Sequence, residues 1–289
     1  MSDVWGEGQE PDLTPVTPLG WLRVALRGLV LGVLVFGGLI ILLLLRLVER
    51  PLFGVKRPLT PWITQAVCRT ALMVMGLRFR ATGHQMKRIG AVVANHSSWL
   101  DIFVLNAKKR VYFVSKAEVV NWPGIGWLAR ATGTVFINRD RREAAAQVKL
   151  FEDRLDAGHK LLFFPEGTST DSRRVLPFKS TLFAAFFTPH LHEVMHIQPV
   201  TVIYRAPTGE DSRFYGWWGD MEFGPHIVRM LATRRHGSVE VVYHEPVKVS
   251  EFTSRKALAA YCEDTVRAPL VLAELDFSQN DQVSEKSAT

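Results

Sequence analysis

A histidine and an aspartate lie five positions apart, directly after the apolar run Ala91–Ala94, which has the pattern of a buried strand. The segment reads Asn95-His96-Ser97-Ser98-Trp99-Leu100-Asp101. If a helix begins after His96, the Asp101 carboxylate lies about one turn inside it and can reach one imidazole nitrogen. The other nitrogen then faces substrate as a general base. Taken alone, such a segment is more often a strand-end histidine capped by an aspartate.

A second polar loop follows another buried-strand pattern. The run Leu161–Phe164 is followed by Pro165-Glu166-Gly167-Thr168-Ser169-Thr170. Glycine lets a ligand approach the backbone, and hydroxyl and amide groups can bind a polar group. Ligands of open α/β sheets bind at the carboxyl ends of the strands, so this loop and His96 are expected at one edge. By itself, a Pro-Glu-Gly sequence is usually an ordinary turn.

Basic residues follow two further strand patterns. The segment Gly133–Ile137 leads into Asn138-Arg139-Asp140-Arg141-Arg142, and Val111–Val114 is followed shortly by Lys116. A guanidinium group at a strand end is a natural phosphate clamp, which makes Arg139 the best candidate of the group. Lys116 is a second candidate phosphate contact. The alternatives are a solvated helix start and a plain surface lysine.

Strand and helix patterns alternate from Leu77 onward, and this alternation predicts an α/β fold with a single open mixed sheet flanked by helices. The expected strands are 77–82, 91–94, 111–114, 133–137, 161–164, 198–204 and 239–243. The expected helices lie near 100–107, 125–131, 142–157, 179–187 and 255–266. We expect this domain to cover 78–275, after a flexible N-terminus (1–20) and before a disordered tail (276–289).

The region 21–77 is expected to anchor the chain in a membrane, through one helix or a helix pair. Gly28–Leu45 is an uncharged apolar run of 18 residues, which as a helix covers about 27 Å, close to a bilayer core. Arg46-Leu47-Val48-Glu49 follows in place of a cleavage site, so the segment is expected to be retained. Basic residues after it favour an inner-membrane protein whose main domain faces the cytoplasm. Residues 58–77 fit an amphipathic interfacial helix or a helix packed on the domain.

The overall charge is basic. The 289 residues carry a formal net charge of +7, and 47% of them are hydrophobic. Because the basic residues are dispersed and no nucleic-acid-binding motif occurs, we expect partners among membrane lipids and phosphorylated substrates rather than nucleic acid. The two cysteines, Cys68 and Cys262, are far apart and are expected to be unpaired thiols.

Three other motifs have weaker support. His192-Glu193-Val194-Met195-His196 matches the zinc-protease pattern, but Pro189 and the strand starting near Gln198 leave too short a helix for two metal ligands. Gly124-Ile125-Gly126-Trp127-Leu128-Ala129 fits a dinucleotide fingerprint but follows Trp122-Pro123 rather than a strand. The chain contains no Gly-x-Ser-x-Gly elbow, which argues against a serine hydrolase of the α/β-hydrolase type.

Four segments in order resemble the glycerolipid acyltransferase family, especially bacterial 1-acylglycerol-3-phosphate acyltransferases. They are the His96–Asp101 stretch, Gly133–Arg139, Phe164–Thr168 and Ile197–Val200. The resemblance spans roughly 77–249. It implies that His96 is the general base and Asp101 its orienting acid.

The resemblance also implies roles for residues around the base. Arg139 corresponds to the phosphate-binding position. Glu166, Gly167 and Thr168 correspond to the segment that helps hold the glycerol phosphate. Pro199 corresponds to a segment associated with acyl-donor binding or with shaping the site, and Lys116 corresponds to a basic position found in many members.

The expected function is O-acyl transfer from acyl-CoA or acyl carrier protein to a lysolipid hydroxyl, with 1-acyl-sn-glycerol 3-phosphate as the main expected acceptor. No cofactor or metal is expected. Ser180 and the aromatic segment Phe214–Met221 depart from the simplest family pattern and resemble the branch containing lyso-ornithine lipid acyltransferases. Lyso-ornithine lipid is therefore the alternative acceptor. More distant alternatives are a membrane-anchored metallopeptidase and a non-catalytic membrane scaffold.

Overall fold

One mixed sheet organises the computed structural model, which describes residues 11, 15–138, 142 and 144–286. The strand order is β1-β7-β6-β2-β5-β3-β4, and β8 pairs with β6. The strands are β1 (Arg78–Gly83), β2 (Gly90–Ala94), β3 (Tyr112–Lys116), β4 (Val135–Ile137), β5 (Leu161–Phe163), β6 (His196–Arg205), β7 (Ser238–Tyr243) and β8 (Val247–Lys248). The predicted fold class is confirmed, and each predicted strand has a counterpart.

The strand directions define the two edges of the sheet. Strands β2, β3, β4, β5 and β6 are mutually parallel along the sheet, whereas β7 and β8 run antiparallel to β6. The segments that follow the five parallel strands therefore start from one edge, which we call the C-terminal edge. The opposite edge, where the same strands begin, is the N-terminal edge.

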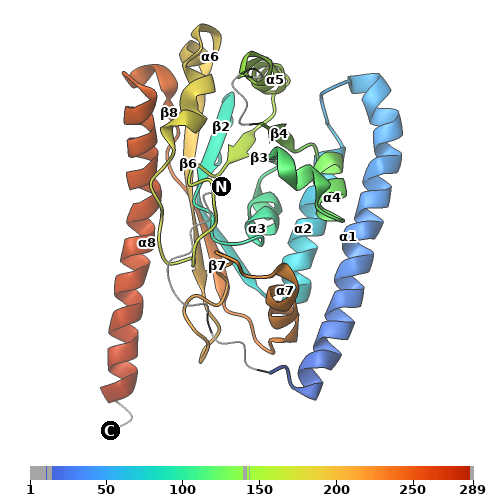
Figure 1. Ribbon diagram of the computed structural model, residues 1–289, viewed down its shortest axis with the longest axis vertical. Helices are drawn as coiled ribbons and strands as arrows, with labels where there is room; N and C mark the ends of the chain where they lie inside the picture. The colour runs from blue at the N-terminus through green and yellow to red at the C-terminus, as the bar shows by residue number, and fades with distance from the viewer. Residues whose placement is uncertain (1–10, 12–14, 139–141, 143, 287–289) are drawn as a thin grey trace.

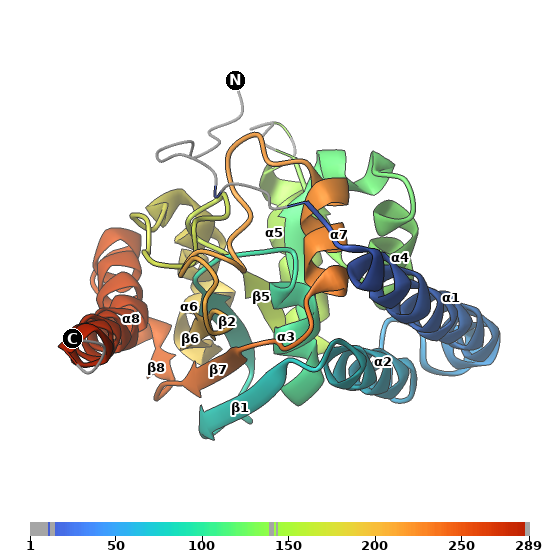
Figure 2. The ribbon, with the colours of Figure 1, turned by 90° about the horizontal axis from the view of Figure 1, so that it is seen from below.

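Helices cover both faces of the sheet (Figures 1 and 2). They are α1 (Pro18–Phe53), α2 (Thr60–Met75), α3 (Asp101–Lys108), α4 (Ile125–Thr132), α5 (Ala144–Asp156), α6 (Pro189–Val194), α7 (Phe223–Ala232) and α8 (Arg255–Lys286). Short 3-10 helices occupy η1 (Ala117–Asn121), η3 (Ser180–Phe187) and η4 (Val249–Glu251).

Alternating side chains of the buried central strands divide the core in two. In β2, Ala91 and Val93 face a core shared with α5, α8 and η3, while Val92 and Ala94 face a core shared with α2, α3 and α7. This is the pattern of a parallel sheet that is covered on both faces. Cys68 and Cys262 are free and belong to opposite cores.

Helix α1 is longer than the apolar run alone indicated. The side chain of Thr17 accepts a hydrogen bond from the Gly20 N–H, and Pro18 occupies the first turn, so the helix starts well before Gly28. Its 36 residues cover about 54 Å. It is long and apolar enough to cross a membrane, and its apolar window is only 6% buried. These properties indicate membrane association.

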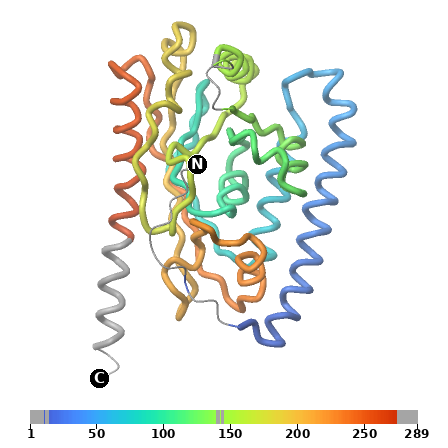
Figure 3. The backbone as a smooth tube through the Cα atoms, viewed as in Figure 1, coloured from blue at the N-terminus to red at the C-terminus, as the bar shows by residue number. Residues whose placement is uncertain are grey.

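Helix α1 lies along the domain rather than projecting from it (Figure 3). Near its start, Arg27 donates to the carbonyl oxygens of Leu231 and Thr233 at the end of α7. Farther along, Gly38 allows close approach to Val67 of α2, because a Cβ at Gly38 would lie 2.5 Å from a Val67 methyl carbon. The apolar outer side of α1 is consequently left uncovered over most of its length.

Four segments differ from the sequence-based expectations. Helix α7 and strand β8 lie where no element was predicted, and 180–187 forms a 3-10 helix rather than an α-helix. Helix α8 continues to Lys286, through residues expected to be irregular. No glycine or proline follows Pro269 in α8, so nothing in the sequence interrupts the backbone hydrogen bonding. Residues 1–10, 12–14 and 287–289 lie outside the described part.

Candidate active site

His96 and Asp101 form a direct pair at the C-terminal edge. Strand β2 ends at Ala94, a short loop carries His96, and Asp101 is the first residue of α3. The His96 Nδ1 atom lies 2.8 Å from Asp101 Oδ2. A carboxylate can only accept here, which places the proton on Nδ1 and leaves Nε2 as the basic nitrogen. The His96 side chain is 22% exposed while that of Asp101 is fully buried.

The carboxylate of Asp101 is fixed by donors on both oxygens. Oδ2 also accepts hydrogen bonds from the backbone N–H groups of Ser97 and Ser98, at 2.8 and 3.1 Å. Oδ1 accepts one from the Tyr204 hydroxyl at 2.7 Å. Burial, followed by the charge of Asp101, raises the pKa of Tyr204 well above its usual value, so the phenol stays a donor. A buried carboxylate needs such partners, and these four hold it in one orientation.

Neighbouring residues fix the His96 loop from two sides. The imidazole stacks on Phe164, with ring centroids 4.0 Å apart and planes 11° from parallel. Asn95 exchanges two hydrogen bonds with the backbone of Val202 in β6. Sequence reasoning missed Asn95 and Tyr204 as site residues. Asn95 stands next to His96, but Tyr204 lies 103 positions from Asp101 and carries no local signal.

The loop after β5 meets the His96 loop directly. Glu166 is 1% exposed, and its two carboxylate oxygens accept the backbone N–H groups of His96 and Leu176, each at 2.7 Å. The His96 carbonyl in turn accepts the Thr170 N–H. Burial raises the pKa of Glu166 to about 8, although the two backbone hydrogen bonds oppose that rise. In this arrangement Glu166 acts on His96 through the backbone.

Gly167 makes a tight turn in this loop. Its φ of +74° favours glycine, and an added Cβ would lie 3.2 Å from Lys179 Nζ. Thr168, next in the chain, is half-buried. The direct contacts predicted between the acceptor and Glu166, Gly167 or Thr168 stay predictions.

The aromatic segment after β6 packs against the same loops. Trp217 donates its backbone N–H to the Ser97 carbonyl, and an added Cβ on Gly216 would lie 2.7 Å from a backbone carbon of Asp171. The Trp99 indole donates to His226 Nδ1, and His226 Nε2 lies 2.9 Å from the Gly216 carbonyl oxygen.

His226 joins these segments as a neutral group. Burial lowers its pKa to about 4, so one ring nitrogen accepts and the other donates. The aromatic segment is thus held next to the His96–Asp101 pair. In the His96–Asp101 pair, Nε2 of His96 can accept a proton from a substrate hydroxyl, and Asp101 can stabilise the resulting imidazolium.

Comparisons with known proteins agree with this chemistry. The family model described as Acyltransferase matches residues 78–203. A lyso-ornithine lipid O-acyltransferase of Rhodobacter capsulatus is 58% identical over 265 residues, covering 92% of this chain and 96% of the relative. The chain belongs to this acyltransferase family.

Two further comparisons concern the sequence and the fold of this acyltransferase. A 1-acyl-sn-glycerol-3-phosphate acyltransferase of Neisseria gonorrhoeae is 41% identical over 178 residues, covering 61% of this chain and 68% of the relative. The crystal structure of the 1-acyl-sn-glycerophosphate acyltransferase PlsC from Thermotoga maritima superposes with a TM-score of 0.62 at 21% identity, covering 88% of this chain and 96% of that one. The protein is an acyltransferase of lysolipids.

The other predicted residues of the acyltransferase lie at different distances along the sheet. Lys116 ends β3 and is half-buried, two strands from β2. Arg139 lies outside the described residues, two positions after β4, which is a third strand away. Strands are spaced about 4.8 Å apart, so β4 is roughly 14 Å from β2. Lys116 is the last residue of β3, and Arg139 follows β4 in the chain, and both strands end at the C-terminal edge.

Pro199 lies inside the sheet, paired with Val93 of β2. Its carbonyl oxygen accepts the His244 N–H on the side of β7 and β8. The N–H and C=O groups of one strand residue point to the same side of the strand. The position where Pro199 lacks an N–H is therefore on the side of β7 and β8, at the gap between their pairing regions with β6. Pro199 is buried there without costing β2 a hydrogen bond. Its predicted role at the acyl donor stays a prediction.

His192 and His196 do not share a helix. Helix α6 ends at Val194, and His196 begins β6. The two-histidine helix of a zinc protease is therefore not formed by this motif.

Proposed function

We propose that this enzyme is a lyso-ornithine lipid O-acyltransferase. The observation that carries the proposal is the 58% identity to the R. capsulatus enzyme over nearly the full length of both chains. This identity favours lyso-ornithine lipid, which was the alternative acceptor, over 1-acylglycerol 3-phosphate, which was the main expected acceptor. The latter is the second candidate acceptor, because the N. gonorrhoeae relative is 41% identical over a shorter region.

His96 is proposed as the general base. Its Nε2 removes the proton of the acceptor hydroxyl as that oxygen attacks the thioester carbonyl of the acyl donor. The C–O bond forms, the C–S bond breaks, and the imidazolium returns its proton to the departing thiolate. Asp101 stabilises the imidazolium during this step, because its carboxylate is already held 2.8 Å from Nδ1. No covalent acyl-enzyme is required.

The donor is proposed to be an acyl thioester, either acyl-CoA or acyl carrier protein, and the reaction uses no further cofactor or metal. On the acceptor side, Arg139 and Lys116 are proposed to face the head group from the ends of β4 and β3. Ornithine carries a carboxylate, which matches a guanidinium fork as a phosphate does. The segment Phe214–Met221 is proposed to help select the acceptor, since it packs on Ser97 beside the base.

Catalysis is proposed at the cytoplasmic face of the inner membrane. The uncovered apolar side of α1 runs beside the domain for most of its length. With that side of α1 in the bilayer, the domain beside it is proposed to lie against the membrane surface. Lysolipid and product can then exchange with the membrane without leaving it.

The test is an acceptor panel with the full chain in vesicles, using acyl-CoA and acyl carrier protein as donors. We expect a higher kcat/KM with lyso-ornithine lipid than with lysophosphatidate. Turnover of lysophosphatidate alone would reject the proposed acceptor and keep the reaction. If neither acceptor is turned over, and wild type behaves as His96→Ala does, the proposed reaction itself is rejected.

A further inference from the structure

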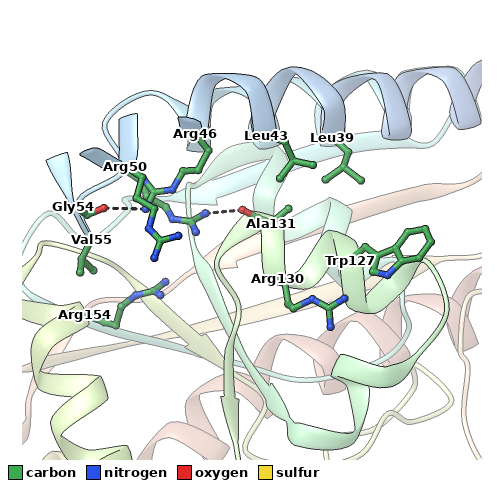
Figure 4. A pocket seen from close by; sticks show the side chains of 11 residues that line it. Leu39, Leu43, Arg46, Arg50, Gly54, Val55, Trp127, Arg130, Ala131 and Arg154 are labelled. Atoms are coloured by element: carbon green, nitrogen blue, oxygen red, sulfur yellow. Dashed lines mark hydrogen bonds between the residues drawn. The ribbon is translucent and has the colours of Figure 1, made fainter. Parts of the chain in front are cut away.

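A pocket rich in arginine lies at the end of α1. Its volume is about 750 Å³. The residues that line it come from α1, the segment after it, α4 and α5. They are Leu39, Leu43, Arg46, Arg50, Gly54, Val55, Arg57, Trp127, Arg130, Ala131 and Arg154. Figure 4 shows the hollow beneath α1, with Arg46 and Arg50 on one side and Arg154 on the other.

The pocket is separate from the His96 site. Arg154 donates to the carbonyl of Gly133, in the turn that precedes β4, and Arg57 donates to that of Ala131, in the last turn of α4. The beginning of β4 belongs to the N-terminal edge, whereas His96 follows the end of β2 at the C-terminal edge. The acyl-transfer step described above uses none of the pocket's residues.

Five guanidinium groups face this hollow, and no carboxylate is among the described residues that line it. Glu49 does not line the pocket, but its Oε2 atom lies 3.1 Å from Nη1 of Arg46 and forms an ion pair with that one arginine, while its oxygens also accept from Leu59 and Thr60. A guanidinium has five N–H donors. Arg57 and Arg130 each use one nitrogen, on the carbonyls of Ala131 and Val120, and Arg50 makes no side-chain hydrogen bond in the described structure. Donors therefore remain for an anion.

The pKa values of buried groups around the pocket also favour a bound anion. Burial, and then the charge of Arg57, lowers the pKa of Arg154 to about 10. Burial lowers the pKa of His159 to about 3, with further lowering by Arg154, Arg57 and Arg46. His159 is 5% exposed, and its Nδ1 atom accepts a hydrogen bond from Nε of Arg154 at 2.7 Å. The positive charges of these arginines repel one another, and a bound anion would reduce that repulsion.

The surroundings indicate which anion fits. Leu39 and Leu43 continue the apolar side of α1 into the pocket, and Trp127 at its rim is 61% exposed. Leu47, Leu52 and Phe53, in the last part of α1, are also exposed. Apolar side chains, tryptophan and arginine occur together where a protein meets the boundary between acyl chains and head groups. A soluble phosphate would use the arginines but would leave the apolar wall without a partner.

We propose that this pocket binds the phosphate head group of an anionic membrane phospholipid, with its acyl chains along α1. The lipid holds the end of α1 at the bilayer surface. It also lies against the arginines that support the turn before β4. This site is independent of the acceptor proposed above.

The test measures binding of short-chain phosphatidylglycerol and phosphatidylcholine to the full chain in detergent, by the rise in its thermal unfolding midpoint. The pocket variant is Arg50→Gln with Arg130→Gln, both exposed and each making at most one side-chain hydrogen bond. The control variant is Arg80→Gln with Arg255→Gln, which removes the same charge from exposed positions on β1 and α8.

We expect phosphatidylglycerol to bind more tightly than phosphatidylcholine, and the pocket variant to weaken it about 10-fold or more. The control variant should bind as wild type does. Equal affinity for both lipids, or an unchanged pocket variant, would overturn the proposal.

Inorganic phosphate and CoA are the remaining probes. Binding of either one as tightly as phosphatidylglycerol, with the same loss in the pocket variant, would assign the pocket to a soluble phosphate instead. Acyl transfer in phosphatidylcholine vesicles should be equal in all three proteins, which separates this result from the proposed reaction.

Discussion

The Tyr204 hydroxyl donates a hydrogen bond to Asp101 Oδ1 at 2.7 Å, while Oδ2 of the same carboxylate holds His96. The two residues come from β6 and from the start of α3, so the geometry of the base depends on the pairing of β6 with β2. Tyr204 is a positioning residue, because it acts on His96 only through Asp101.

Replacing Tyr204 by Phe should loosen the Asp101 carboxylate without removing it. A hydrogen bond to a charged group contributes about 1.5–3 kcal/mol, so we expect a loss of unfolding free energy in this range. The kcat should fall by roughly 10-fold, with little change in KM, because the base rather than substrate binding is affected. Denaturant unfolding and steady-state kinetics measure the two effects. Tyr243→Phe is the control, since that tyrosine is also buried but lies at the end of β7, where the antiparallel strand reaches the opposite edge. Equal kinetics for the two variants would show that Tyr204 does not position Asp101.

Changes to the base itself should be far larger. His96→Ala should lower kcat by about 10²–10⁴-fold, the range of a general base. Asp101→Asn keeps the size of the side chain but removes the charge that stabilises the imidazolium, so a loss of similar order is expected. Thermal unfolding of the same preparations separates loss of chemistry from loss of fold. Wild-type rates in both variants would exclude the proposed mechanism.

The sequence predicted the central strands because their side chains are buried in continuous apolar runs, as in Ala91–Ala94. It did not predict α7, whose start contains Gly224-Pro225 and resembles a turn. That helix is stabilised from a distance, since Met230 is fully buried and Arg27 of α1 bonds to the carbonyls at its end. The helix propensity of residues 223–232 does not reflect these long-range contacts, so it could not predict the helix.

The same limit applies to the candidate site. His96 and Asp101 could be paired from their spacing because a single loop joins them. Tyr204 reaches Asp101 only through the strand order, and Glu166 reaches the His96 backbone only because β5 lies next to β2. Four ordered motifs indicated which residues belong together but not which atoms they contact. For Glu166, the contact is with two backbone N–H groups.

Glu166 should make stability depend on pH. Its pKa is raised to about 8 in the folded protein from an ordinary value of 4.5, with burial as the largest cause. The folded state therefore binds the proton more tightly than the unfolded state. This contribution to stability is complete below about pH 4.5 and is lost as the pH rises toward 8.

Glu166→Gln removes this titration, so the difference in unfolding free energy between pH 5 and pH 8 should shrink, by an amount on the order of a few kcal/mol. Urea unfolding at both pH values measures it. Glu245→Gln, at an exposed position, should leave the difference unchanged. Parallel pH profiles for wild type and Glu166→Gln would contradict the assignment of the shift to Glu166.

Gly216 should tolerate no side chain, because a Cβ there would lie 2.7 Å from a backbone carbon of Asp171. Gly216→Ala must push the aromatic segment away from the loops that carry the base, at a cost of about 1–3 kcal/mol. The adjacent Trp217 N–H would then lose the Ser97 carbonyl. Gly224→Ala is the matched control, since nothing lies within 4 Å of its Cβ position and the residue belongs to α7. We expect a lower thermal midpoint and a lower kcat/KM for Gly216→Ala, and an unchanged or slightly higher midpoint with normal activity for Gly224→Ala. If Gly216→Ala lowers the midpoint but keeps wild-type kcat/KM for both candidate acceptors, the aromatic segment stabilises the fold without shaping the site.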